Sequence, residues 1–123
     1  MSDKTIKVEK TLEAIIEGIQ KIKGKDITLI DLNTIQHTEC GYFVICHGTS
    51  TTQVDSIAHS VEDTVKEFTE ENPWHRDGYR NAIWILLDYG DIMVHVFKEE
   101  AREFYNLEGL WADAKVSKIE EDI

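Results

Sequence analysis

Apolar side chains recur at every third or fourth position in two long segments of the chain, the spacing that places them on one face of an α-helix. The first segment covers residues 7–23 and ends before Gly24, a residue type that commonly terminates helices. The second covers residues 52–70 and ends shortly before Pro73, whose ring disfavours helical geometry in the preceding residue. The apolar residues of the two segments are Val8, Leu12, Ile15, Ile16, Ile19 and Ile22, and Val54, Ile57, Ala58, Val61, Val65 and Phe68. We therefore predict two amphipathic helices, each packed on another element through this face.

Shorter segments rich in β-branched and aromatic residues predict four strands, over residues 27–32, 42–46, 82–87 and 92–97. The last two strands are joined by Asp88-Tyr89-Gly90-Asp91, in which Gly90 can adopt the positive φ of a three-residue hairpin loop. A third helix is predicted over residues 98–106, and its apolar pattern continues to Trp111 past a break at Gly109.

The order of these elements predicts an α/β fold with a single mixed β-sheet covered by helices. A β-α-β step leads from the strand at 42–46 over the second helix to the strand at 82–87, so we expect these two strands to be parallel neighbours. The hairpin then adds an antiparallel strand. We assign residues 1–114 to one domain and residues 115–123 to a charged C-terminal tail that we expect to be mobile.

Composition and charge limit the functions that this fold can serve. The chain of 123 residues carries a formal net charge of −11, which repels polyphosphate and attracts basic proteins, so we expect little direct contact with nucleic acid. No apolar run approaches the roughly 18 residues of a membrane span, and the polar N-terminus is not typical of a targeting peptide. We therefore expect a cytoplasmic protein without a membrane partner. The only two cysteines, Cys40 and Cys46, are predicted to be reduced packing residues.

The spacing of polar residues does not favour catalysis. Gly48-Thr49-Ser50 precedes a helix, but without a phosphate-loop pattern it is better interpreted as a turn with Ser50 or Thr51 as helix cap. Two-metal nucleotidyl transfer needs two carboxylates at positions i and i+2 of a strand. Asp88 and Asp91 are three residues apart, and Asp26 and Asp31 are five apart. The histidines show no metal-ligand spacing, so we predict no catalytic residue, metal or cofactor.

Aromatic residues are the stronger candidates for a functional surface. Trp84, Trp111, Tyr89 and Tyr105 are residue types that anchor protein interfaces, although core packing can also explain them. We expect Tyr89 to be solvated, because it lies at the tip of a hairpin. His95 is predicted either at the rim of a binding surface or, as the favoured alternative, as a hydrogen-bonded structural histidine.

Several motifs in this order resemble the ribosomal silencing factor family, RsfS, also called Iojap. They are residues 42–45 followed by 48–50, residues 84–91 leading into 94–97, residues 102–108, and residues 110–114. The resemblance implies a nucleotidyltransferase-like α/β fold without catalytic carboxylates. It also implies a factor without enzymatic activity that binds the large ribosomal subunit through ribosomal protein L-fourteen, blocks joining of the subunits and represses translation in starvation or stationary phase.

By the same resemblance, we predict a partner-binding surface on which acids pair with basic side chains and aromatics fill apolar patches. Its residues are Trp84, Asp88, Tyr89, Asp91, His95, Tyr105 and Trp111. One departure from the family pattern is Gly41, which stands where the family usually has an acid. Two alternatives stay open at this point, namely a nucleotidyltransferase-like enzyme and a homo-oligomeric scaffold, and a homodimer could coexist with ribosome binding.

Overall fold

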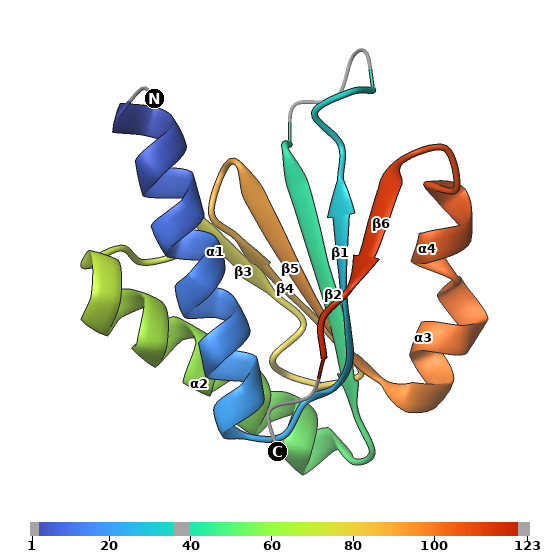
Figure 1. Cartoon of the computed structure of the whole chain (residues 1–123). Helices are drawn as coiled ribbons and strands as arrows, with labels where there is room; N and C mark the ends of the chain where they lie inside the picture. The colour runs from blue at the N-terminus through green and yellow to red at the C-terminus, as the bar shows by residue number, and fades with distance from the viewer. Residues whose placement is uncertain (1–2, 36–39, 121–123) are drawn as a thin grey trace.

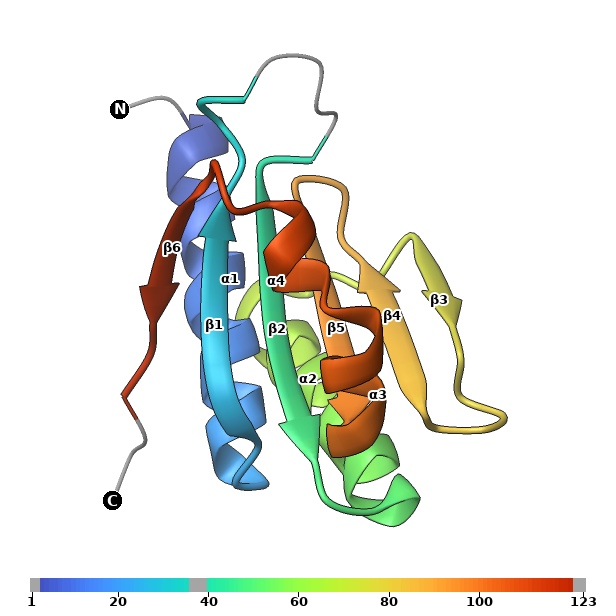
Figure 2. The same cartoon turned by 90° about the vertical axis from the view of Figure 1, so that its right-hand side faces the viewer.

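The protein folds around one six-stranded sheet with the strand order β3-β4-β5-β2-β1-β6 (Figures 1 and 2). The computed structural model describes residues 3–35 and 40–120, and residues 1–2, 36–39 and 121–123, which include His37, lie outside the described part. The helices are α1 (Asp3–Lys21), α2 (Thr51–Thr69), α3 (Glu99–Tyr105) and α4 (Leu107–Leu110). The strands are β1 (Lys25–Asp31), β2 (Tyr42–Gly48), β3 (His75–Asp77), β4 (Trp84–Asp88), β5 (Ile92–Lys98) and β6 (Lys115–Lys118). The predicted single α/β domain with a mixed sheet is confirmed.

The sheet contains one parallel pair, β2 with β5, and its other neighbouring strands are antiparallel. The expectation that β2 would pair in parallel with the first strand of the hairpin is therefore wrong. β5 is buried almost throughout, from Val94 to Phe97, whereas β4 alternates between buried and half-buried residues. A strand that is apolar on both faces is more stable in the centre of a sheet, so the hairpin inserts β5 beside β2 and leaves β4 further out.

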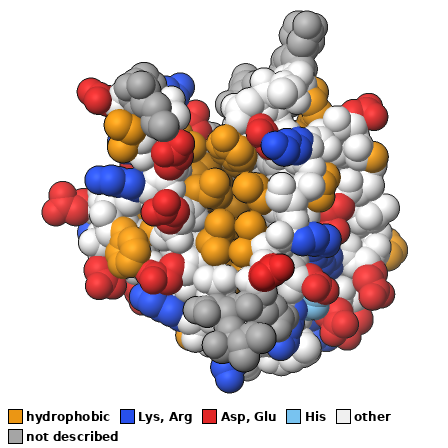
Figure 3. Space-filling view, in the orientation of Figure 1, with side chains coloured by type: hydrophobic (Ala, Val, Ile, Leu, Met, Phe, Trp, Pro, Cys, Tyr) orange, Lys and Arg blue, Asp and Glu red, His pale blue; other side chains and the backbone are white. Residues whose placement is uncertain are grey.

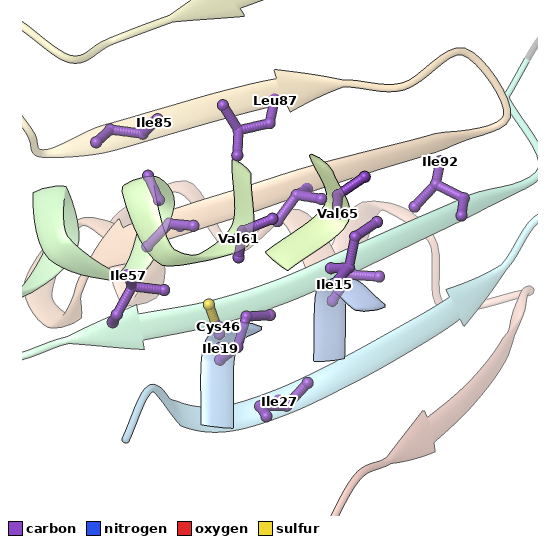
Figure 4. Packing of buried hydrophobic residues seen from close by; sticks show 14 of the residues in the cluster. Ile15, Ile19, Ile27, Cys46, Ile57, Val61, Val65, Ile85, Leu87 and Ile92 are labelled. Atoms are coloured by element: carbon purple, nitrogen blue, oxygen red, sulfur yellow. The ribbon is translucent and has the colours of Figure 1, made fainter. Parts of the chain in front are cut away.

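Helices cover the two faces of the sheet unequally. The long helices α1 and α2 pack together on one face, and the short helices α3 and α4 lie on the other (Figures 1 and 2). The larger core lies under α1 and α2, and Ile15 of α1, Ile57 and Val61 of α2, and Ile85 and Leu87 of β4 belong to it (Figure 4). Gly18 permits the close approach of the two helices, because a Cβ atom there would lie 2.8 Å from the Cα of Val61. The smaller core, under α3 and α4, is built around Phe97.

The hairpin turn and the helix cap that the local sequence predicted are both confirmed. β4 and β5 are joined by the three residues 89–91, and Gly90 has a φ of +86°. The Asp88 carboxylate accepts a hydrogen bond from the Gly90 N–H at 2.7 Å, which stabilises this turn. Ser50 caps α2, since its hydroxyl oxygen accepts a hydrogen bond from the backbone N–H of Gln53 at 3.1 Å. Cys40 and Cys46 are buried free thiols.

The predicted C-terminal tail needs a correction. Residues Lys115–Lys118 form β6 and pair with β1 in an antiparallel register, at the edge of the sheet. The Ile119 N–H continues this pairing by donating to the Ile27 carbonyl oxygen at 2.9 Å. The ladder hydrogen bonds of an exposed edge strand depend little on its side chains, which explains why the charged composition of this segment concealed the strand. The sheet therefore extends beyond the boundary that was predicted at residue 114.

Candidate functional site

Trp84 lies at the centre of an aromatic cluster on the face of the sheet that carries α3 and α4. Its indole ring stacks on Phe97 with 4.8 Å between ring centroids and packs against Tyr105 at 4.9 Å. Alternation along β4 places Leu86 and Asp88 on the same face, and all three side chains are half-buried. Helix α3 packs on β5 and β2, so this face of β4 remains partly open to solvent.

His95, on the neighbouring strand β5, holds the Trp84 ring through a hydrogen bond. The Trp84 Nε1–H donates to His95 Nδ1 at 3.1 Å, which makes Nδ1 an acceptor and places the proton of the neutral ring on Nε2. Only 5% of the residue is exposed, and burial lowers the pKa of His95 to about 4. The Nε2 atom has no hydrogen-bond partner in the described part of the chain. Of the two roles predicted for His95, its position is that of the hydrogen-bonded structural histidine.

The cluster extends from Trp84 to the short helices. Phe43 lies 4.7 Å from the His95 ring and 5.8 Å from Trp111, measured between ring centroids. Tyr105 is about half exposed, whereas Trp111 is half-buried against the smaller core. The structure thus brings Trp84, Tyr105 and Trp111 together around the rings of Phe43 and the buried His95, so a partner surface would be formed by the first three and not by His95.

Two strongly exposed residues beside this cluster were not among the predicted site residues. Phe104 is 81% exposed and Leu110 is 75% exposed, although both belong to apolar patterns that predicted burial. α3 has only seven residues, and it buries Ala101 and Arg102 instead of Phe104. Large apolar side chains that stay exposed on neighbouring helices are typical of interaction surfaces. The apolar spacing alone could not distinguish this surface from a core-facing stripe.

The acids of the hairpin tip lie at the other end of the open face of β4. Asp88 and Asp91 are half-buried, and one carboxylate oxygen of Asp88 is already used by Gly90 in the turn. Asp91 forms a long ion pair with Lys4, with 3.8 Å between its carboxylate oxygen and Lys4 Nζ. Exposed pairs of this kind contribute little, so both acids can accept basic groups of a partner.

Tyr89 does not lie on this surface. The residue is only 8% exposed and packs into the larger core, so the expectation of a solvated tip residue is wrong. Side chains alternate along the strand, and Tyr89 follows Ile85 and Leu87 onto the face covered by α1 and α2. Burial raises the pKa of the Tyr89 phenol, and its hydroxyl has no hydrogen-bond partner among the described residues.

A buried arginine holds α3, and with it Tyr105, on the sheet. The Arg102 guanidinium donates to the Asp26 carbonyl oxygen at 2.7 Å, to Thr28 Oγ1 at 3.0 Å and to Glu108 Oε1 at 2.8 Å. It also lies 3.0 Å from His47 Nδ1, and burial followed by this cation lowers the pKa of His47. Asp26 has a φ of +47° where the β1–β2 register shifts, so Arg102 binds a carbonyl group at an irregular point of the ladder.

Two other kinds of feature are absent from the part of the chain that the structure describes. No group of three or more His, Cys, Asp and Glu side chains in residues 3–35 and 40–120 is placed to hold a metal ion. No helix in the same residues is long and apolar enough to cross a bilayer.

Known proteins share both the sequence pattern and the fold. The family model described as "Ribosomal silencing factor during starvation" matches residues 5–123. The chain belongs to the ribosomal silencing factor family. Ribosomal silencing factor RsfS of Halalkalibacterium halodurans is 34% identical over 112 residues, which cover 91% of this chain and 94% of that protein.

Solved and more distant relatives agree with this assignment to the ribosomal silencing factor family. A crystal structure of a Chromobacterium violaceum protein superposes with a TM-score of 0.79 at 30% identity, covering 92% of this chain and 93% of that chain. A mouse protein named "Mitochondrial assembly of ribosomal large subunit protein 1" is 27% identical over 103 residues, which are 81% of this chain and 44% of that protein. Family membership connects this chain to the ribosome, and the bacterial relative of Halalkalibacterium halodurans is named a ribosomal silencing factor.

Proposed function

We propose that this protein binds the large ribosomal subunit through ribosomal protein L-fourteen and thereby blocks joining of the small subunit. The observation that carries the proposal is the partly exposed aromatic cluster around Trp84, which continues to Asp88 and Asp91 at the hairpin tip. Rigid aromatic side chains fill apolar pockets of a partner at low entropic cost, and flanking acids pair with basic side chains. Such a factor acts by occupying a surface and needs no catalytic residue.

Charge supports a basic protein as the partner. The chain has 24 acidic and 13 basic residues, so its field repels ribosomal RNA and favours a positively charged ribosomal protein. The name of the mouse relative refers to the large ribosomal subunit, which agrees with the subunit proposed here. A factor that meets free large subunits acts in the cytoplasm of the cell, where starvation or stationary phase would call for repression of translation.

Cosedimentation with isolated large subunits tests the proposal. We expect the wild-type chain to sediment with large subunits and to reduce the formation of joined ribosomes when small subunits are added. Tyr105→Ala removes an exposed ring that packs on Trp84, and its affinity should fall about tenfold or more, the effect of losing an interface anchor. Phe68→Ala is the matched control, because it removes an exposed ring from α2 on the other face of the sheet. Equal affinities of the Tyr105 variant and the wild type would contradict this surface, and joining unaffected by the wild type would contradict the blocking role.

We also propose a homodimer, which would form through a different surface from the one around Trp84. Hydrophobic side chains gather between α1 and β1 on the face opposite α3 and α4 (Figure 3). Leu12 of α1 and Leu29 of β1 are partly buried hydrophobic residues that pack against the larger core. Exposed apolar surface of this kind is covered in many proteins by a second copy. We expect the sedimentation coefficient to rise with protein concentration, and Leu29→Glu should abolish the rise. A sedimentation coefficient independent of concentration would contradict the dimer without affecting ribosome binding.

A further inference from the structure

We propose that the hollow beside Trp74, at the tip of the hairpin, binds an arginine side chain of the ribosomal partner. Trp74, which the family resemblance does not assign a role, forms the apolar wall of this hollow, and Asp88 and Asp91 supply its charge. This inference rests on the proposed function for the identity of the partner, but the hollow and its chemistry are properties of this chain.

Trp74 is both strongly exposed and held in place. It is 81% exposed, although a tryptophan in such a position loses the benefit of burial. Its backbone N–H donates to the Asp88 carbonyl oxygen at 2.7 Å, directly before β3 pairs with β4. Its ring lies against Gly90, because a Cβ atom on that glycine would come within 2.9 to 3.1 Å of three indole carbons. The indole is therefore a fixed aromatic surface that projects from the tip.

Beside this ring lies a hollow of about 230 Å³ whose other walls are suited to a cation. The described residues that line it are Trp74, Asp88, Gly90, Asp91, Met93 and Cys40, which include two acidic residues and no basic one. The Gly90 hydrogen bond uses only one oxygen of the Asp88 carboxylate. The Asp91 carboxylate oxygen lies 3.8 Å from Lys4 Nζ, and 46% of the Asp91 side chain and 77% of the Lys4 side chain are exposed. A cation of the partner therefore meets two acids that no strong ion pair neutralises within the described residues.

Arginine fits these walls better than lysine does. A guanidinium group is planar, so it can stack on the indole ring of Trp74 while its edge donates to a carboxylate. A lysine ammonium is more strongly hydrated and lacks the flat surface for stacking. Met93 offers an apolar side chain to the methylene groups of either residue.

The hollow is continuous with the proposed partner surface. Asp88 follows Trp84 and Leu86 on one face of β4, and Met93 precedes His95 and Phe97 on the same face of β5. A basic protein that covers Trp84 therefore reaches the tip without crossing to the other face of the sheet. The arginine would fix the orientation of the partner at the end of the interface opposite α3.

Titration with acetyl-Gly-Arg-Gly-amide tests the hollow without a ribosome. We expect the indole N–H resonance of Trp74, assigned through Trp74→Phe, to shift in a saturable manner while those of Trp84 and Trp111 stay in place. Acetyl-Gly-Lys-Gly-amide should bind several-fold more weakly. The double variant Asp88→Asn, Asp91→Asn should lose the response, although the amide oxygen introduced at position 88 can still accept the hydrogen bond from Gly90. A Trp74 resonance unmoved by the arginine peptide in the wild type would overturn the proposal.

Cosedimentation with large subunits then tests whether the hollow contributes to binding of the ribosome. Trp74→Ala should bind about tenfold more weakly than the wild type at low salt, and the difference should shrink at high salt as charge is screened. Trp74→Phe should retain part of the affinity, and Phe68→Ala should behave as the wild type. Full affinity of Trp74→Ala, with wild-type binding intact, would overturn this inference and leave the proposed function standing. Absence of wild-type binding would contradict the proposed function, and the peptide titration would still decide whether the hollow takes arginine.

Discussion

Replacing Arg102 with methionine is expected to lower the free energy of unfolding by about 3 to 5 kcal/mol, the cost of disrupting a buried hydrogen-bonded charge. The guanidinium group satisfies the Asp26 carbonyl, the Thr28 hydroxyl and the Glu108 carboxylate, and methionine leaves all three without this donor. The side chain is 9% exposed, so water does not readily replace these hydrogen bonds. α3 would lose its main polar attachment to β1.

Urea denaturation at neutral pH measures this effect. Arg80→Met is the matched control, since it removes an exposed arginine and should change the unfolding free energy by no more than about 0.5 kcal/mol. Arg102→Lys should be intermediate, because an ammonium group keeps the charge but lacks the fork that reaches several acceptors. A loss below about 1 kcal/mol for Arg102→Met would mean that the network is not structurally important.

Acidification is expected to destabilise the fold through His95. Burial lowers the pKa of His95 to about 4 from the ordinary value of 6.5, so the folded state disfavours the imidazolium. Above pH 6.5 the ring is neutral in both states and the effect is absent. As the pH falls from 6.5 toward 4, His95 becomes protonated in the unfolded chain but stays largely neutral in the folded chain. The free energy of unfolding therefore falls by up to about 3 kcal/mol. Below pH 4 the loss no longer grows.

Unfolding free energies measured at pH 7 and pH 4.5 isolate this contribution when variants are compared. His95→Gln keeps an acceptor for the Trp84 indole and removes the titration, so it should lose clearly less stability than the wild type over this interval. Carboxylates also titrate in this range, but they do so in both proteins. His59→Gln is the matched control, because it makes the same substitution at a side chain that is 58% exposed. Equal pH dependence in the His95 variant and the wild type would show that burial does not suppress the charge of this ring.

Local sequence signals predicted those parts of the molecule whose stability depends on neighbours in the chain. The helical spacing of apolar residues predicted α1 and α2, and Gly90 predicted the hairpin loop, because the backbone geometry of a turn limits which residues fit it. The motifs around Trp84 and Trp111 predicted the family. The spacing of the acids argued against a two-metal site, the net charge favoured a basic partner, and the family resemblance implied the partner surface, which stays a proposal.

Contacts between distant segments set the remaining features. β5 rather than β4 lies beside β2, because burial on both faces depends on which helices cover the sheet. Two of the acceptors of Arg102, the Asp26 carbonyl and Thr28 Oγ1, lie in β1, 76 and 74 positions away, which no local pattern reveals. Tyr89 is buried because strand alternation carries it under α1 and α2, and β6 forms because β1 offers an open edge. Periodicity and turn signals therefore predicted most of the elements, and the resemblance of the motifs predicted the family. Long-range packing and pairing determined the strand order, the edge strand, and which aromatic residues remain available to a partner.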